Sequence, residues 1–146
     1  MKRQRGFTLI ELIIVLAVLG ILVGTTIPLY RTFQQRAYGS EATAMLKRIL
    51  DAEVMYFLEN ETFYPRVIGD LIQIFHNDPA DKEEIARIKE ALKLAIPVRH
   101  FLDFEIRRLE NGCLVTINSP QHSFPLFSDG SPSITAYVDD TGKITF

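Results

Sequence analysis

The sequence predicts an α+β fold in which one long N-terminal helix packs on a small antiparallel β-sheet of three to four strands, with one extra short helix. Three patterns predict it: an apolar run near the N-terminus, helical spacing of apolar residues up to about residue 60, and alternation of apolar and polar residues in the C-terminal third. With 146 residues, of which 47% are hydrophobic and 23% charged, the chain has room for one small domain and a membrane segment.

The apolar run extends from Phe7 to Tyr30 and follows the basic residues Lys2, Arg3 and Arg5. About 20 apolar helical residues cross a bilayer core about 30 Å thick, so this run is long enough to span it. The positive-inside rule predicts that the basic residues stay in the cytoplasm. Glu11 interrupts the run. Because a carboxylate inside a membrane helix costs about 2.5 to 3.5 kcal/mol, Glu11 is a candidate functional residue.

A secretory signal peptide and a plain membrane anchor are two alternative interpretations of this segment. A signal peptide has an apolar region of about 7 to 15 residues, whereas this run is longer, contains Glu11 and continues through the small residues Gly24 and Thr25. A plain anchor is compatible with the length, but it gives no reason for Gly6 before the run or for Glu11 within it.

The segment Gly6-Phe7-Thr8-Leu9-Ile10-Glu11-Leu12 resembles the class III signal of type IV pilins and type II secretion pseudopilins. In that family, a membrane-embedded prepilin peptidase cuts after the glycine and methylates the new N-terminal phenylalanine. The resemblance implies cleavage between Gly6 and Phe7, with residues 1–6 as a cytoplasmic leader and residues 7–30 as a transmembrane and filament-core helix. It extends to Pro28, Ala37-Tyr38, Ser40 and Phe63-Tyr64-Pro65.

This resemblance implies a structural subunit of a type IV pilus, which polymerises from the bacterial inner membrane into a filament for attachment, motility or DNA uptake. The implied partners are further copies of the chain, the prepilin peptidase, and an inner-membrane assembly platform with its ATPase. Glu11 would pair with the Phe7 amine of a neighbouring subunit. A type II secretion pseudopilin is an alternative that the signal does not separate from a pilin. A single-helix membrane-anchored binding module is an alternative of another class.

Residues 31–60 are predicted to continue the helix with an amphipathic pattern. The apolar stripe that we expect to pack on the sheet consists of Met45, Leu46, Ile49, Leu50, Val54, Phe57 and Leu58. The residues that we expect mainly on the solvated or subunit-facing surface are Lys47, Arg48, Asp51 and Glu53.

Gly20, Gly24 and Pro28 weaken the middle of this helix. Pro28 removes the hydrogen bond to the carbonyl of Gly24, at a cost of about 3 kcal/mol in a helix interior. A kink is the simplest consequence. The resemblance to type IV pilins implies more, namely that the stretch from Gly20 to Pro28 can extend when the subunit leaves the bilayer.

Residues 61–146 are predicted to form a periplasmic or extracellular globular domain. Its first element, Asp70 to Phe75, is either one helical turn or a short strand, because so few residues have no clear period. A second helix is predicted to begin with Asp78 as its N-cap and Pro79 at its first position, and to end at Pro97.

The predicted strands cover residues 98–109, 113–118, 134–138 and 144–146, with a loop over residues 119–132. Asn111-Gly112 is a strong signal for a two-residue hairpin turn. A turn at these two residues would place Ile106 opposite Ile117.

The sequence contains no recognisable catalytic motif. His76, His100 and His122 have no ligand-like spacing to one another or to Cys113, and HExxH, CxxC, GxSxG and phosphate-binding motifs do not occur. We therefore expect a protein that is not an enzyme and has no cofactor or metal. The single cysteine excludes an intrachain disulfide.

Two further observations concern possible ligands. The aspartates in the segments Asp129-Gly130-Ser131 and Asp139-Asp140 suit tight turns, and calcium binding is the alternative interpretation. The net charge of −2 and the lack of a basic aromatic patch argue against nucleic-acid binding.

Overall fold

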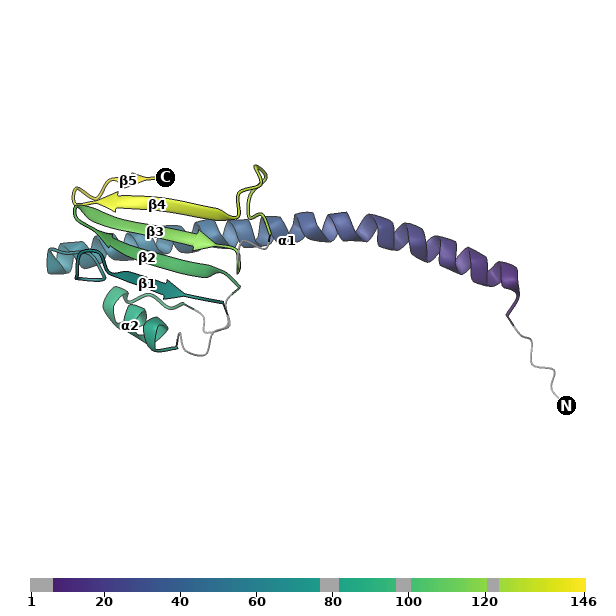
Figure 1. Ribbon diagram of the computed structural model, residues 1–146, viewed down its shortest axis with the longest axis horizontal. Coiled ribbons are helices and arrows are strands. Elements are labelled where there is room, and N and C mark those ends of the chain that lie inside the picture. The colour runs from purple at the N-terminus through teal and green to yellow at the C-terminus, as the bar shows by residue number, and fades with distance from the viewer. Residues whose placement is uncertain (1–6, 77–81, 97–100, 121–123) are drawn as a thin grey trace. The chain divides into compact units, whose positions relative to one another are not determined.

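A computed structural model describes residues 7–76, 82–96, 101–120 and 124–146 (Figure 1). Its elements follow the order α1 (Leu9–Asn60), β1 (Leu71–Ile74), α2 (Lys82–Leu92), β2 (Asp103–Leu109), β3 (Gly112–Asn118), β4 (Ser133–Asp139) and β5 (Ile144–Thr145). The predicted α+β architecture is confirmed. The chain divides into two compact units between Gln34 and Gln35.

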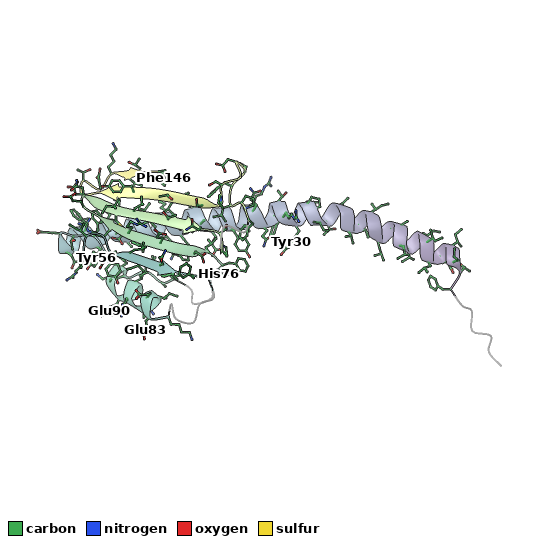
Figure 2. The ribbon with its side chains drawn as sticks, in the orientation of Figure 1. Tyr30, Tyr56, His76, Glu83, Glu90 and Phe146 are labelled. Carbon is green, nitrogen blue, oxygen red and sulfur yellow. The ribbon has the colours of Figure 1, made fainter. Side chains whose placement is uncertain are left out.

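The first unit contains the N-terminal half of α1. Figure 2 shows side chains above and below this part of the ribbon, with Tyr30 among them. Most of them are apolar and exposed, as Leu16 at 58% and Tyr30 at 63% illustrate. By length and composition, α1 is able to cross a membrane.

In the second unit, the C-terminal half of α1 lies against one face of the sheet (Figure 1). Its buried residues are Gly39, Ala42, Met45, Leu46, Ile49, Leu50, Glu53 and Tyr56. The predicted stripe is confirmed at Leu46 and Leu50, but two expectations are wrong, because Glu53 is fully buried and Leu58 is 71% exposed. At about 100° per residue, Glu53 lies about 20° from Leu46 around the helix axis and Leu58 about 120° from it. Glu53 therefore lies near the centre of the buried face.

The sheet has five strands in the order β1-β2-β3-β4-β5, and all neighbouring strands are antiparallel. This is more than the three to four strands predicted. The additional strand is β1, whose residues Ile72 and Ile74 are buried while Leu71 and Gln73 are exposed. Four residues are too few for periodicity to separate a strand from a helical turn.

The register of the β2–β3 hairpin differs from the predicted one. Ile106 pairs with Val115, and Phe104 pairs with Ile117, because Glu110 and Asn111 form the turn and Gly112 belongs to β3. A Cβ on Gly112 would lie 2.2 Å from the carbonyl oxygen of Val138. Gly112 is therefore required by the close approach of β4 and not by the turn.

Helix α2 ends at Leu92, although the sequence predicted that it continues to Pro97. Lys93 adopts a left-handed conformation with a φ of 54°, which ends the helix without the glycine that usually marks such a position. Leu94 and Ile96 are then buried in a non-helical segment. The predicted helix start at Asp78-Pro79, together with His100 and His122, lies outside the described residues.

Candidate functional site

Phe7 and Glu11, which are predicted to carry processing and assembly, lie at the N-terminal end of the described chain. The leader residues Lys2, Arg3, Arg5 and Gly6 are outside the described part of the chain. Phe7 precedes the helix and is 77% exposed, and Glu11 lies in the first helical turn. The structure therefore leaves the Phe7 side chain accessible to another molecule.

Thr8 and Glu11 form a reciprocal cap of this helix. The backbone N–H and the hydroxyl group of Thr8 donate to Oε2 of Glu11 at 2.8 and 2.7 Å, and the N–H of Glu11 donates to Oγ1 of Thr8 at 3.3 Å. This arrangement is a capping box, which satisfies backbone donors that have no partner within the helix. Its sequence signal, Thr-x-x-Glu before an apolar run, is present, but the interpretation of Glu11 as a membrane charge left it unrecognised.

The cap leaves acceptor capacity on Glu11. Both bonds from Thr8 end on Oε2, and no described residue donates to Oε1. A carboxylate offers about four acceptor positions, so Glu11 is able to receive an amine or another cation while the cap stays in place.

The stretch from Gly20 to Pro28 is helical in this structure. The hydroxyl groups of Thr25 and Thr26 donate to the carbonyl of Leu22 at 3.0 and 2.7 Å. A Cβ added at Gly20 or Gly24 would meet no atom within 4 Å. The glycines are therefore not required by packing within this chain, and the extension of this stretch remains a prediction.

Comparison with known proteins identifies this N-terminal segment. The prokaryotic N-terminal methylation motif matches residues 1–27. The chain is 46% identical over 61 residues to the type IV major pilin protein PilA of Myxococcus xanthus, covering 42% of this chain and 28% of PilA. It is 41% identical over 63 residues to the type IV major pilin protein PilE of Neisseria gonorrhoeae, covering 43% of this chain and 37% of PilE. Part of the chain is therefore similar to type IV major pilins, and its first 27 residues carry the methylation motif.

The similarity to these pilins is limited in extent. A fimbrial protein of Pseudomonas aeruginosa is 39% identical over 61 residues, which cover 42% of this chain and 40% of the relative. The chain thus spans less than half the length of each of these three relatives, and no solved structure matches it. Most of the globular domain therefore has to be interpreted from its own residues.

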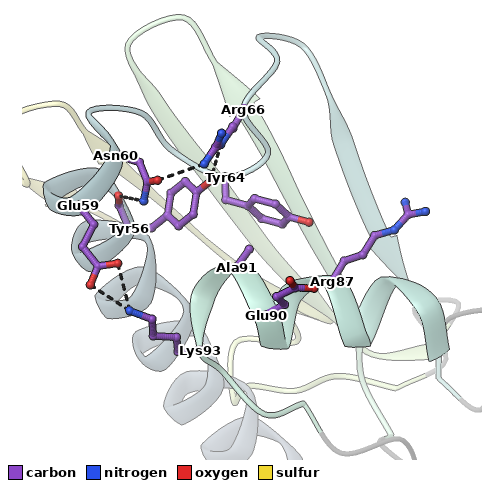
Figure 3. A pocket seen from close by; sticks show the side chains of 9 residues that line it. All are labelled: Tyr56, Glu59, Asn60, Tyr64, Arg66, Arg87, Glu90, Ala91 and Lys93. Carbon is purple, nitrogen blue, oxygen red and sulfur yellow. Dashed lines mark hydrogen bonds and ion pairs between the residues drawn. The ribbon is translucent and has the colours of Figure 1, made fainter.

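The globular domain has a shallow groove of about 430 Å³ between the end of α1 and α2 (Figure 3). The groove is lined by Tyr56, Glu59, Asn60, Tyr64, Arg66, Arg87, Glu90, Ala91 and Lys93. Lys93 pairs with Glu59 at 3.0 Å, and Arg66 donates to the hydroxyl of Tyr56 at 2.7 Å. Because these cations already have partners beside the groove, its chemistry does not single out a ligand.

The aspartates considered for calcium bind their own turns. Oδ1 of Asp139 accepts bonds from the N–H groups of Thr141 and Lys143, at 3.0 and 2.9 Å, and from the Thr141 hydroxyl. These hydrogen bonds lower the pKa of Asp139, with the Thr141 side chain as the main cause. Asp129 likewise accepts the N–H of Ser131 at 2.8 Å. Within the described residues, no group of three potential metal ligands is present.

Proposed function

We propose that the chain is a structural subunit of a type IV pilus, made as a membrane precursor and polymerised into a filament. The observation that carries this proposal is the methylation motif on a helix whose apolar side chains are exposed and whose first turn holds Glu11. An exposed apolar surface of this length requires either lipid or other helices. A pilin subunit meets both environments in succession.

Processing would convert the precursor into the form that assembles. Cleavage between Gly6 and Phe7 by a prepilin peptidase removes the basic leader and exposes a positive amine on Phe7. Methylation to a secondary amine keeps that charge. The N–H of Thr8 is unaffected by this cut, so the cap that it forms with Glu11 can persist in the mature subunit.

Glu11 would set the axial register of each subunit in the filament. In a bundle of apolar helices, an unpaired carboxylate is costly, whereas one paired with the Phe7 amine of a neighbour is tolerated. Oε1 is available for this pairing because the bonds from Thr8 occupy Oε2. A subunit in the wrong register would bury a lone charge, so the pairing also selects against misassembly.

Before assembly, the subunit would lie in the bacterial inner membrane with its basic N-terminus in the cytoplasm and its globular domain outside. An assembly platform and its ATPase would extract it. A pseudopilin of a type II secretion system remains the second candidate, because the methylation motif supports both equally. Neighbouring genes for pilus retraction or for a secretion apparatus would distinguish them.

The test compares Glu11→Ala with Thr8→Val in cells that assemble the filament. Glu11→Ala should insert into the membrane normally and lose most of the filament yield, because the docking charge is gone. Thr8→Val keeps the carboxylate and the backbone N–H but removes the capping hydroxyl, so it should assemble much better. Equal loss in both variants would assign the role of Glu11 to helix capping, and normal assembly of Glu11→Ala would refute docking.

N-terminal sequencing of the mature protein checks the processing step in the same cells. The first residue should be methylated Phe7. A mature chain that retains residues 1–6 would instead favour a membrane-anchored binding module.

A further inference from the structure

A buried polar cluster, which we call the Glu53 cluster, lies where α1 meets the sheet. It consists of Glu53 on α1, Tyr64 in the following loop, Arg108 on β2 and Cys113 on β3. Glu53 and Cys113 are fully buried, and Arg108 is 8% exposed. The proposed assembly mechanism uses none of these four residues.

Glu53 joins the helix to the loop that follows it. Its Oε2 accepts the backbone N–H of Tyr64 at 3.0 Å. Its Oε1 is buried and has no hydrogen-bond partner among the described residues. A single hydrogen bond compensates poorly for the burial of an ionised carboxylate. Removing the ionised carboxylate from water costs far more free energy than removing the neutral carboxyl group.

Arg108 brings a positive charge to the cluster but directs its donors elsewhere. One terminal nitrogen donates to the carbonyls of Leu109 and Gly112, at 2.6 and 2.7 Å, so the guanidinium closes the β2–β3 hairpin. The guanidinium carbon, Cζ, lies 5.3 Å from the centre of the Phe63 ring. Its Nε is buried without a described partner. Arg108 therefore attracts the Glu53 carboxylate through space without a direct ion pair among the described contacts.

We propose that protonation of Glu53 controls how firmly the loop at residues 61–66 is held against α1. The neutral carboxyl fits the buried site and keeps its bond from Tyr64. The ionised carboxylate has one hydrogen bond and an indirect charge partner, so the site is poorly suited to it. Loss of the proton would loosen the loop at the end of α1. This inference does not depend on the proposed function.

Burial raises the pKa values of the titratable groups in the Glu53 cluster. Burial raises the pKa of Glu53 from 4.5 to about 8, against the opposing effects of the Tyr64 N–H and the Arg108 charge. Burial also raises the pKa of the Cys113 thiol, and the charge of the nearby Glu53 is the second cause. Burial also raises the pKa of the Tyr64 hydroxyl, with Glu84 as a smaller cause. Cys113 and Tyr64 thus stay neutral while Glu53 titrates.

The sign of the pH effect follows from these values. In the unfolded chain, Glu53 ionises near pH 4.5, whereas in the folded chain it holds its proton up to about pH 8. Unfolding between these limits releases one proton. The contribution of Glu53 to stability is therefore fully present below pH 4.5 and is lost as the pH rises to about 8.

The experiment measures unfolding of the full chain in detergent micelles from about pH 5 to about pH 9, followed by the near-ultraviolet circular dichroism of its tyrosines. In the unchanged chain, the unfolding equilibrium constant should rise by up to about tenfold for each unit of increase in pH, until about pH 8. The reason is that unfolding releases the proton of Glu53. Glu53→Gln should lose this slope, since the amide can still accept the Tyr64 N–H and cannot ionise. Glu59→Gln is the matched control, because Glu59 lies on the same helix and is exposed.

Identical pH profiles for Glu53→Gln and the unchanged chain would overturn the proposal, as would loss of the slope in Glu59→Gln. If Glu53→Gln does not fold, isotope-edited infrared spectroscopy of the carboxyl groups in the unchanged chain decides. A buried protonated glutamic acid at neutral pH, lost above about pH 8, supports the proposal. A Glu53 that is fully ionised at neutral pH refutes it.

Discussion

Two glutamates on the same helix, Glu11 and Glu53, lie in opposite environments. Glu11 is exposed, belongs to the helix cap and has an oxygen that no described residue binds. Glu53 is fully buried and binds the backbone of its own domain. Glu11 is therefore accessible to another molecule, whereas Glu53 is enclosed by the residues of its own domain.

The apolar residues of α1 show the same contrast. In the first unit they are exposed throughout, and in the second unit they form part of a core with the sheet and α2. The second unit therefore buries apolar surface of its own, whereas the first unit leaves its apolar surface exposed. Stability of the domain and assembly of the proposed filament should thus respond to different substitutions.

The largest expected difference is between Leu46→Ala and Leu16→Ala. Leu46 is fully buried, so its truncation should lower the free energy of unfolding of the globular domain by about 2 to 5 kcal/mol. Leu16 is 58% exposed, so Leu16→Ala should change that free energy by less than about 0.5 kcal/mol. Chemical denaturation in detergent measures both values. A similar loss in the two variants would show that the two parts of α1 are not energetically separate.

A smaller effect is expected in the middle of α1. Gly20→Ala and Gly24→Ala meet no neighbouring atom, so each should stabilise the helix by about 1 kcal/mol. If assembly requires extension of this stretch, the double variant should insert normally and yield fewer filaments. Helicity is measured by far-ultraviolet circular dichroism and filament yield by electron microscopy. Greater helicity together with normal yield would argue against extension.

The smallest effect is expected at Asp139, an acid whose partners all belong to its own turn. Its pKa is lowered in the folded chain, so its stabilising contribution is present above the unfolded value of 3.8 and is lost as the pH falls below it. Asp139→Asn should therefore be slightly less stable than the unchanged chain at neutral pH, and the difference should shrink in acid. Denaturation curves at neutral pH and near pH 3 provide the comparison. A difference that grows in acid would contradict this account.

Much of the fold follows from patterns that extend over many residues. The length of α1, the apolar stripe around Leu46 and the alternation in β2, β3 and β4 were all predictable, because burial of one face imposes a period on the sequence. The capping box at Thr8 was also recognisable from its spacing. These features depend on neighbours within one element.

The incorrect predictions concern contacts between elements. The pair Asn111-Gly112 predicts a turn at both residues, but the small size of Gly112 is needed by β4, which the local sequence does not indicate. Lys93 ends α2 in a conformation that glycine usually adopts. Glu53 was assigned to the surface by its charge, although its angular position lies at the centre of the buried face. At Gly112 and Glu53, packing between elements decides the residue's position, and the local sequence does not show it.

The hydroxyl groups near Pro28 affect the environment in which this stretch of α1 can extend. Thr25 and Thr26 both direct their hydroxyls to the carbonyl of Leu22, and Thr32 bonds to the carbonyl of Pro28. In hydrocarbon, a hydroxyl without a partner is penalised, so these bonds keep the polar groups compatible with lipid only while the backbone is helical. If the stretch extends, the same hydroxyls and carbonyls must find other partners. Lipid would then oppose extension, and water or neighbouring chains would permit it.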